Sequence, residues 1–120
     1  MAEIRNITAL DDLDRILAES DQVPVWIFKH SLACGASSHA LKEFRRFVDD
    51  LDPDDPAHFA LVEIQQVPEI SWEVTQRSGV QHESPQLILW HNGAVAWEAS
   101  HWAIEKRALD EVRGNHKSDP

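Results

Sequence analysis

The sequence has little cysteine and few basic residues, and it lacks any long apolar run. Its one cysteine, Cys34, cannot form an internal disulfide, so this thiol is either buried and inert or reacts with something outside the chain. Only 11 Lys and Arg stand against 21 Asp and Glu, and the resulting net charge of −10 repels nucleic acids and anionic membranes. No segment approaches the ~20 apolar residues of a membrane span. We therefore expect neither a nucleic-acid nor a membrane partner.

The length and composition predict one domain. A chain of 120 residues, 42% of them hydrophobic, has room for a single core. We expect this domain to span residues 1–114 and a polar C-terminal tail to span residues 115–120. The residues from Met1 to Asn6 lack a basic stretch followed by an apolar one, which predicts a cytoplasmic protein.

The spacing of apolar residues predicts alternating helices and strands. Helices repeat their apolar residues at intervals of three and four, whereas buried strands are short apolar runs bounded by turn residues. The predicted helices run from Thr8, as N-cap, to about Ser20, from Cys34 to just before Pro53, from Pro68 to Gly79, and from Ile104 to Gly114. The predicted strands cover residues 23–28, 59–64, 87–90 and 95–97, with a short edge strand at 3–7 and a hairpin turn at Asn92-Gly93.

This order of elements is that of the thioredoxin fold. A helix-strand-helix-strand unit comes first, and a further helix, a hairpin and a last helix follow it. We therefore predict an α/β protein with a thioredoxin-like fold, in which a central mixed sheet of about four strands is flanked by helices.

The position of Cys34 predicts a reactive thiol. It lies between a buried-strand pattern and a long helix pattern, in the segment Ala33-Cys34-Gly35. The unpaired N–H groups and the dipole of a helix start stabilise a thiolate, which is the reactive form of cysteine. The helix dipole alone is too weak to account for a stable thiolate. Gly35 leaves the backbone beside the sulfur open to an incoming disulfide. The polar residues near in sequence that could add to this stabilisation are Lys29, His30, Ser31, Ser37 and Ser38.

A proline about fifty residues later is the second mark of such a thiol site. Ser84-Pro85-Gln86 opens an apolar strand, and in a thioredoxin-like fold this loop would lie beside the cysteine. We expect the Ser84-Pro85 bond to be cis, so that the backbone of Ser84 faces an incoming disulfide. Three further residues could complete the pocket: His82, His101 and Trp102.

The cysteine allows two other interpretations. A free cysteine is often simply a buried packing residue, but the neighbours of Cys34 are small or polar rather than apolar. A metal site is disfavoured because paired-ligand spacing is missing, and we expect no metal. The histidines that such a site would need are His30, His39, His82 and His101.

Three motifs together carry a family resemblance. They are Lys29-His30-Ser31-x-x-Cys34-x-x-Ser37, His82-Glu83-Ser84-Pro85-Gln86 and Ser100-His101-Trp102. On these motifs the chain resembles the YtxJ family, the monothiol bacilliredoxin-like proteins of bacteria that use bacillithiol as their main small thiol.

The resemblance implies roles for particular residues. Cys34 would be the active cysteine, Pro85 the cis-proline, and Ser37 would stand where dithiol relatives carry a resolving cysteine. The small-thiol site would be lined by Lys29, His30 and the backbone of Ser84-Pro85-Gln86. The family commonly has proline after the cysteine, where this chain has Gly35.

The resemblance also implies an activity. Cys34 would remove bacillithiol from mixed disulfides on client proteins, with bacillithiol as co-substrate and with no bound cofactor. A second small thiol, a dithiol bacilliredoxin or a reductase would then recycle the protein. Two alternatives stay open: a binding module regulated by modification of Cys34, and a silent scaffold with an unreactive thiol.

Overall fold

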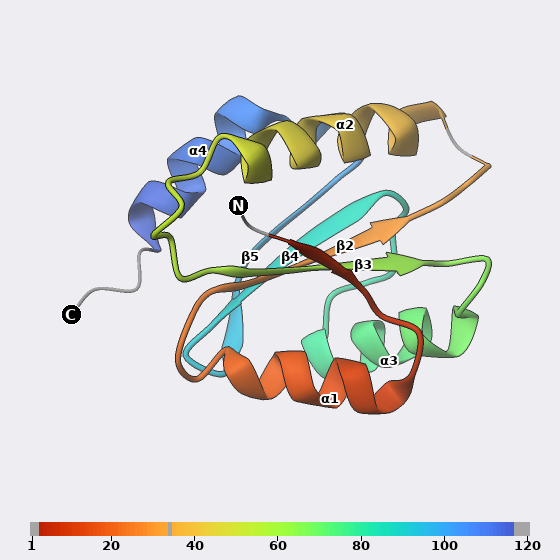
Figure 1. Cartoon of the computed structure of the whole chain (residues 1–120). Helices are drawn as coiled ribbons and strands as arrows, with labels where there is room; N and C mark the ends of the chain where they lie inside the picture. The colour runs from red at the N-terminus through yellow and green to blue at the C-terminus, as the bar shows by residue number, and fades with distance from the viewer. Residues whose placement is uncertain (1–2, 34, 117–120) are drawn as a thin grey trace.

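The computed structural model describes residues 3–33 and 35–116, which form a sheet with helices on both faces (Figure 1). The elements in chain order are β1 (Ile4–Asn6), α1 (Leu10–Glu19), β2 (Val25–His30), α2 (Gly35–Asp49), β3 (His58–Glu63), α3 (Pro68–Ser78), β4 (Gln86–His91), β5 (Ala94–Ser100), a 3-10 turn η1 (His101–Ala103) and α4 (Lys106–Asn115).

The sheet is mixed and has the strand order β1-β3-β2-β4-β5. β1, β3 and β2 are parallel to one another, whereas β4 is antiparallel to β2 and to β5. The α/β prediction is thus confirmed. The prediction of about four strands is corrected to five, because the short edge strand pairs with β3 from Ile4 opposite Phe59 onward.

β2 lies at the centre of the sheet and is buried along its whole length. Its side chains alternate between the two faces, as the pleat of a strand requires. Trp26 and Phe28 pack into the cluster under α2 and α4, whereas Ile27 packs into the cluster under α1 and α3. In Figure 1 these two helix pairs lie above and below the sheet.

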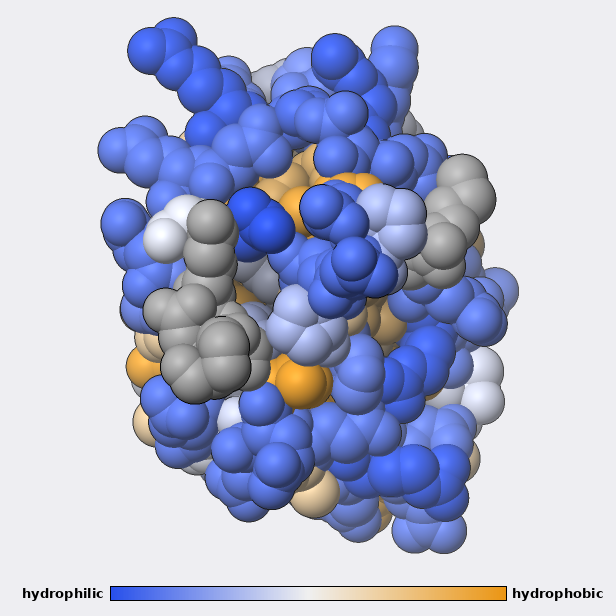
Figure 2. Space-filling view, turned by 60° about the vertical axis from the view of Figure 1, so that its left-hand side comes forward, coloured by the Kyte–Doolittle hydropathy of each residue, from blue (hydrophilic) through white to orange (hydrophobic). Residues whose placement is uncertain are grey.

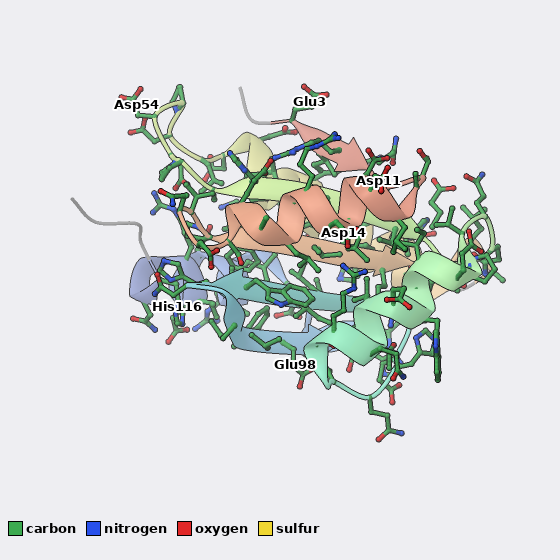
Figure 3. All side chains as sticks on the ribbon, turned by 90° about the horizontal axis from the view of Figure 1, so that it is seen from below. Glu3, Asp11, Asp14, Asp54, Glu98 and His116 are labelled. Atoms are coloured by element: carbon green, nitrogen blue, oxygen red, sulfur yellow. The ribbon has the colours of Figure 1, made fainter. Side chains whose placement is uncertain are left out.

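The helices of the lower layer are also linked by charge. Asp14 on α1 accepts a hydrogen bond from Arg77 on α3. Figure 3 views this layer from below and shows the two helices crossing the same face of the sheet. The ion pair therefore supplements the apolar contacts that both helices make with the sheet.

Several element ends differ from the sequence prediction. β2 begins at Val25, after Pro24, and it extends through Lys29 and His30, because its pairing with β3 continues to His30 opposite Glu63. The N-cap of α1 is Ala9, not Thr8, and no side chain caps this helix.

The last helix also starts later than predicted. The turn η1 separates β5 from α4, which begins at Lys106 rather than Ile104. α4 then includes Asn115, one residue beyond the predicted end at Gly114. Most of the predicted tail, residues 117–120, lies outside the described residues.

Several elements that bear on the predicted site meet at one end of the sheet. The carboxyl ends of β2 and β3, the start of α2 and the start of β4 meet at the right-hand side of Figure 1. The view in Figure 2 brings the opposite side forward, and this face is mainly hydrophilic. Within residues 3–33 and 35–116, no helix is both long enough and apolar enough to cross a membrane.

Candidate functional site

Cys34, the predicted reactive residue, lies outside the described residues, so its exposure and its surroundings stay predictions. The residues on either side of it are described. Ala33 belongs to the turn after β2, and Gly35 is the first residue of α2. Both are exposed. The described part of the site therefore includes the segments that flank the cysteine in the chain.

The segment that contains Pro85 leads directly into β4. The Ser84–Pro85 peptide bond is cis, the geometry that the sequence predicted. Pro85 is buried, and its carbonyl oxygen accepts a hydrogen bond of 3.0 Å from the backbone N–H of His101. Because Gln86 pairs with Lys29 across the sheet, this segment lies at the same edge as the end of β2.

Lys29 is a fully buried cation beneath this edge. Its ammonium group donates hydrogen bonds to Nδ1 of His82 at 2.7 Å and, at 3.2 Å each, to Oγ1 of Thr75 and Oε1 of Gln86. Burial lowers the pKa of Lys29 to about 8, and the nearby Glu83 carboxylate partly opposes that shift. Among the described residues, the side chains of Thr75, His82 and Gln86 are thus the hydrogen-bond partners of this ammonium group.

This burial bears on the expected site residues. The family resemblance implied that Lys29 and the backbone of Gln86 line the small-thiol site, and the side chains of these two residues are 0% and 1% exposed. The amide nitrogen of Gln86 donates to the carbonyl of Gln81 at 2.9 Å. Both side chains therefore support the segment from Gln81 to Gln86 from below.

The imidazole of His30 is held by the first turn of α2. Its Nδ1 lies 2.7 Å from Oγ of Ser37, which also accepts a hydrogen bond of 2.9 Å from the backbone N–H of Ser31. Ser37 is fully buried and His30 nearly so. Burial is the main reason that the pKa of His30 is lowered, so this imidazole is neutral at physiological pH. Ser37 thereby connects the end of β2 to α2.

The turn before the cysteine has a second anchor that the sequence did not suggest. The side-chain oxygen of Gln65 accepts from the backbone N–H of Leu32 at 3.0 Å, and its nitrogen donates to Oγ of Ser31 at 2.9 Å. Oγ of Ser31 in turn accepts from the N–H of Ala33 at 3.3 Å. Gln65 lies two residues after the end of β3, and this position near the end of a parallel strand was the only available signal.

The three residues proposed to complete the pocket lie in different surroundings. His82 contacts the buried Lys29, and Nε2 of His101 lies 3.3 Å from the carboxylate of Glu83. Trp102 is 61% exposed, and its ring packs against the ring of His39 on α2 at a centroid distance of 5.1 Å. His82 and His101 thus flank the Pro85 segment, whereas Trp102 lies over α2.

The described residues form no metal centre. Within residues 3–33 and 35–116, no group of three or more His, Asp or Glu side chains is placed to hold an ion. A site that includes Cys34 falls outside this statement.

Solved structures with a similar fold define the class of this protein. A proposed oxidoreductase with a thioredoxin fold matches it with a TM-score of 0.79 at 23% identity, over 92% of this chain and 93% of that one. Thioredoxin from Malassezia sympodialis matches with a TM-score of 0.75 at 16% identity, over 97% and 92% of the two chains. Thioredoxin from Fasciola hepatica matches with a TM-score of 0.75 at 17% identity, over 95% and 100%. The chain therefore has a thioredoxin fold.

The family is more specific than the fold. Residues 5–109 match the family described as monothiol bacilliredoxin BrxC. The chain belongs to this family, which confirms the resemblance inferred from its motifs. Family and fold together support a thiol-dependent redox function.

Proposed function

We propose that this protein removes bacillithiol from client proteins by monothiol exchange at Cys34. The observation that carries the proposal is the match to the monothiol bacilliredoxin family over residues 5–109, which spans both Cys34 and the Ser84–Pro85 segment. The position of the Pro85 segment, at the same end of the sheet as the start of α2, supports it further.

The proposed reaction has two exchange steps. The Cys34 thiolate attacks the bacillithiol sulfur of a client mixed disulfide, a Cys34–bacillithiol disulfide forms, and the client cysteine leaves as a thiolate. In the second step the thiolate of another thiol attacks this disulfide and releases Cys34 as a thiolate. That thiol would be supplied by a second small thiol, a dithiol bacilliredoxin or a reductase in the cytoplasm.

The chain itself offers no thiol for the second step. Cys34 is its only cysteine, and Ser37 stands three residues later, where a resolving cysteine would be needed. The Oγ of Ser37 is bonded to His30 and Ser31, and a hydroxyl does not resolve a disulfide. We therefore expect the bacillithiol adduct of Cys34 to accumulate until an external thiol arrives.

The test uses a model protein that carries one bacillithiol on one cysteine. Mass spectrometry of the reduced wild-type protein after mixing should find an adduct with the mass of bacillithiol on Cys34 while the model protein is released as a free thiol. Cys34→Ser should be inactive, and Glu111→Gln, at an exposed position on α4 (Lys106–Asn115), should behave as wild type.

Other outcomes would favour other functions. An adduct that forms once and that external thiols do not discharge would indicate a redox-responsive binding module. If the alkylation rate of Cys34 rises with pH at the same midpoint as that of a free cysteine, the protein would be a silent scaffold. Equal exchange with glutathione adducts would keep the chemistry and overturn the choice of bacillithiol.

A further inference from the structure

One surface groove runs along α2 from its first turn and is unusually basic. It has a volume of about 380 Å³ and lies beside the helix that follows Cys34. Ser38, Lys42 and Arg45 follow one another at helical intervals of four and three, so they share one face of α2. The residues that line the groove are His30, Ser38, Leu41, Lys42, Arg45, Arg46 and Asp49.

The charge of this groove contrasts with that of the whole chain. The protein has a net charge of −10, yet three of its 11 Lys and Arg residues line this one groove. Arg46 is paired with Glu43 at 3.0 Å. Among residues 3–33 and 35–116, no carboxylate forms an ion pair with Lys42 or Arg45.

These unpaired cations are not explained by the stability of the helix. Like charges three or four residues apart destabilise a helix slightly, and Lys42 stands in that relation to both Arg45 and Arg46. Such a cluster attracts an anion, and the low-dielectric wall of a groove strengthens that attraction. The groove therefore has the electrostatic character of a carboxylate site.

His30 supplies a directional donor in the groove. Ser37 Oγ accepts from the Ser31 N–H, so its own proton can be donated to Nδ1 of His30; in that tautomer the imidazole proton is on Nε2. Within the described part of the chain, Nε2 of His30 has no hydrogen-bond partner. Arg45 is close enough to contribute to the lowered pKa of His30, while Glu63 on β3 opposes that shift.

We propose that this groove binds the carboxylate end of the small thiol whose sulfur is exchanged at Cys34. The carboxylates would lie against Lys42 and Arg45, and Nε2–H of His30 would donate to a hydroxyl or carbonyl oxygen of the ligand. Bacillithiol fits this chemistry, because its malate group supplies carboxylates. This assignment rests on the proposed function, which it deepens by giving the small thiol a binding site.

The dimensions of the groove suit a small molecule. Ligand pockets commonly measure ~300–1,000 Å³, and this groove lies at the lower end of that range. Lys42 follows Gly35 by seven residues, which is ~10 Å along a helix axis. A small thiol held at the start of α2 can span that length.

The binding test does not depend on thiol chemistry. S-methyl bacillithiol, which cannot exchange, is titrated into the wild-type protein while backbone amide shifts are followed by NMR. We expect shifts at residues 38–45 and affinity roughly tenfold weaker in K42Q/R45Q, as expected for the loss of two charge-assisted contacts. R15Q/R107Q loses the same charge at exposed positions on α1 and α4 and should bind as wild type.

A second measurement connects the groove to exchange. Cys34 should react faster with dithiodipropionate, which carries carboxylates, than with cystamine, which carries amines, and K42Q/R45Q should reduce only the first rate. Equal binding by K42Q/R45Q, or amide shifts confined to other residues, would overturn the groove assignment. Displacement by inorganic phosphate at the same affinity would also overturn it, because the groove would then be a general anion site.

The two proposals fail in different ways. If S-methyl bacillithiol binds residues 38–45 but Cys34 does not exchange with a bacillithiol mixed disulfide, the exchange reaction is wrong and the groove stands. If exchange proceeds at the same rate in K42Q/R45Q and in wild type, the groove is wrong and the exchange reaction stands.

Discussion

The ammonium nitrogen of Lys29 lies 2.7 Å from Nδ1 of His82, so a buried cation is bonded to an imidazole from the loop before Pro85. Lysine has only donors, and Nδ1 must therefore be the acceptor, with the imidazole proton on Nε2. Burial and the charge of Lys29 both lower the pKa of His82. The pair thus carries a single positive charge beneath the segment that presents Pro85.

This pair predicts a pH-dependent contribution to stability. Because burial lowers the pKa of Lys29 from 10.5 to about 8, the unfolded chain binds more protons than the folded one between these values. The free energy of unfolding should therefore gain at most ~3 kcal/mol from Lys29 as the pH rises from about 8 to 10.5. Urea unfolding of wild type and Lys29→Met across this range should show the gain only in wild type.

The control for this experiment is Lys42→Met, which removes an exposed lysine from the same chain. Its stability should follow pH in parallel with that of wild type. Parallel curves for wild type and Lys29→Met would mean that Lys29 keeps an ordinary pKa in the folded protein.

Ser37→Ala should destabilise the fold. The change removes the acceptor of the Ser31 N–H and the partner of His30 Nδ1, and both groups are buried. A buried polar group left without a partner costs ~1–3 kcal/mol, so the free energy of unfolding should fall by about that amount. Ser38→Ala, at an exposed position next to it, should change stability by less than ~0.5 kcal/mol. Equal stability of the two variants would contradict this role for Ser37.

Much of the fold follows from local patterns. The apolar run of β2 predicts a central strand, and Asn92-Gly93 predicts the hairpin turn, where both residues have positive φ, 57° and 76°. Strand ends were less predictable. Lys29 and His30 are polar, so their place within a fully buried strand depends on partners elsewhere in the chain.

The site was less predictable than the fold. Lys29 bonds to residues 46 to 57 positions away, and Gln65 bonds to Leu32 across 33 positions, so no local pattern reveals either contact. The strongly negative net charge did not predict the groove on α2, because a net charge does not indicate where cations cluster. Motifs identified the candidate residues, and only the fold separated supporting side chains from exposed ones.

The edge strand β1 should depend on ionised Glu19. Its carboxylate accepts from Arg5 on β1 at 2.7 Å and lies 2.6 Å from Nδ1 of His58 on β3, and the hydrogen bond from Arg5 is the main reason its pKa is lowered from 4.5. A lowered carboxyl pKa adds stability that is present above pH 4.5 and is lost as the pH falls through the folded-state value.

Glu19→Gln should therefore be less stable than wild type near neutral pH, and the difference should disappear in acid. Because the network is partly exposed, we expect a difference of no more than ~1 kcal/mol. Hydrogen exchange of the β1 amides should report the same trend. Glu111→Gln, on the exposed side of α4, is the control and should show no such convergence. A constant difference from neutral to acid pH would contradict the electrostatic explanation.

Gly35→Ala should stabilise the protein without strain. Gly35 is the first residue of α2, its φ is not in the left-handed region, and a Cβ built there meets nothing within 4 Å. Alanine restricts the unfolded chain more than glycine does, so we expect the free energy of unfolding to rise by ~0.4–1 kcal/mol. Thermal unfolding measures this change. Gly79→Ala should destabilise instead, because Gly79 ends α3 with φ of +71°. If Gly35→Ala were as destabilising as Gly79→Ala, the start of α2 would need the conformational freedom of glycine beside Cys34.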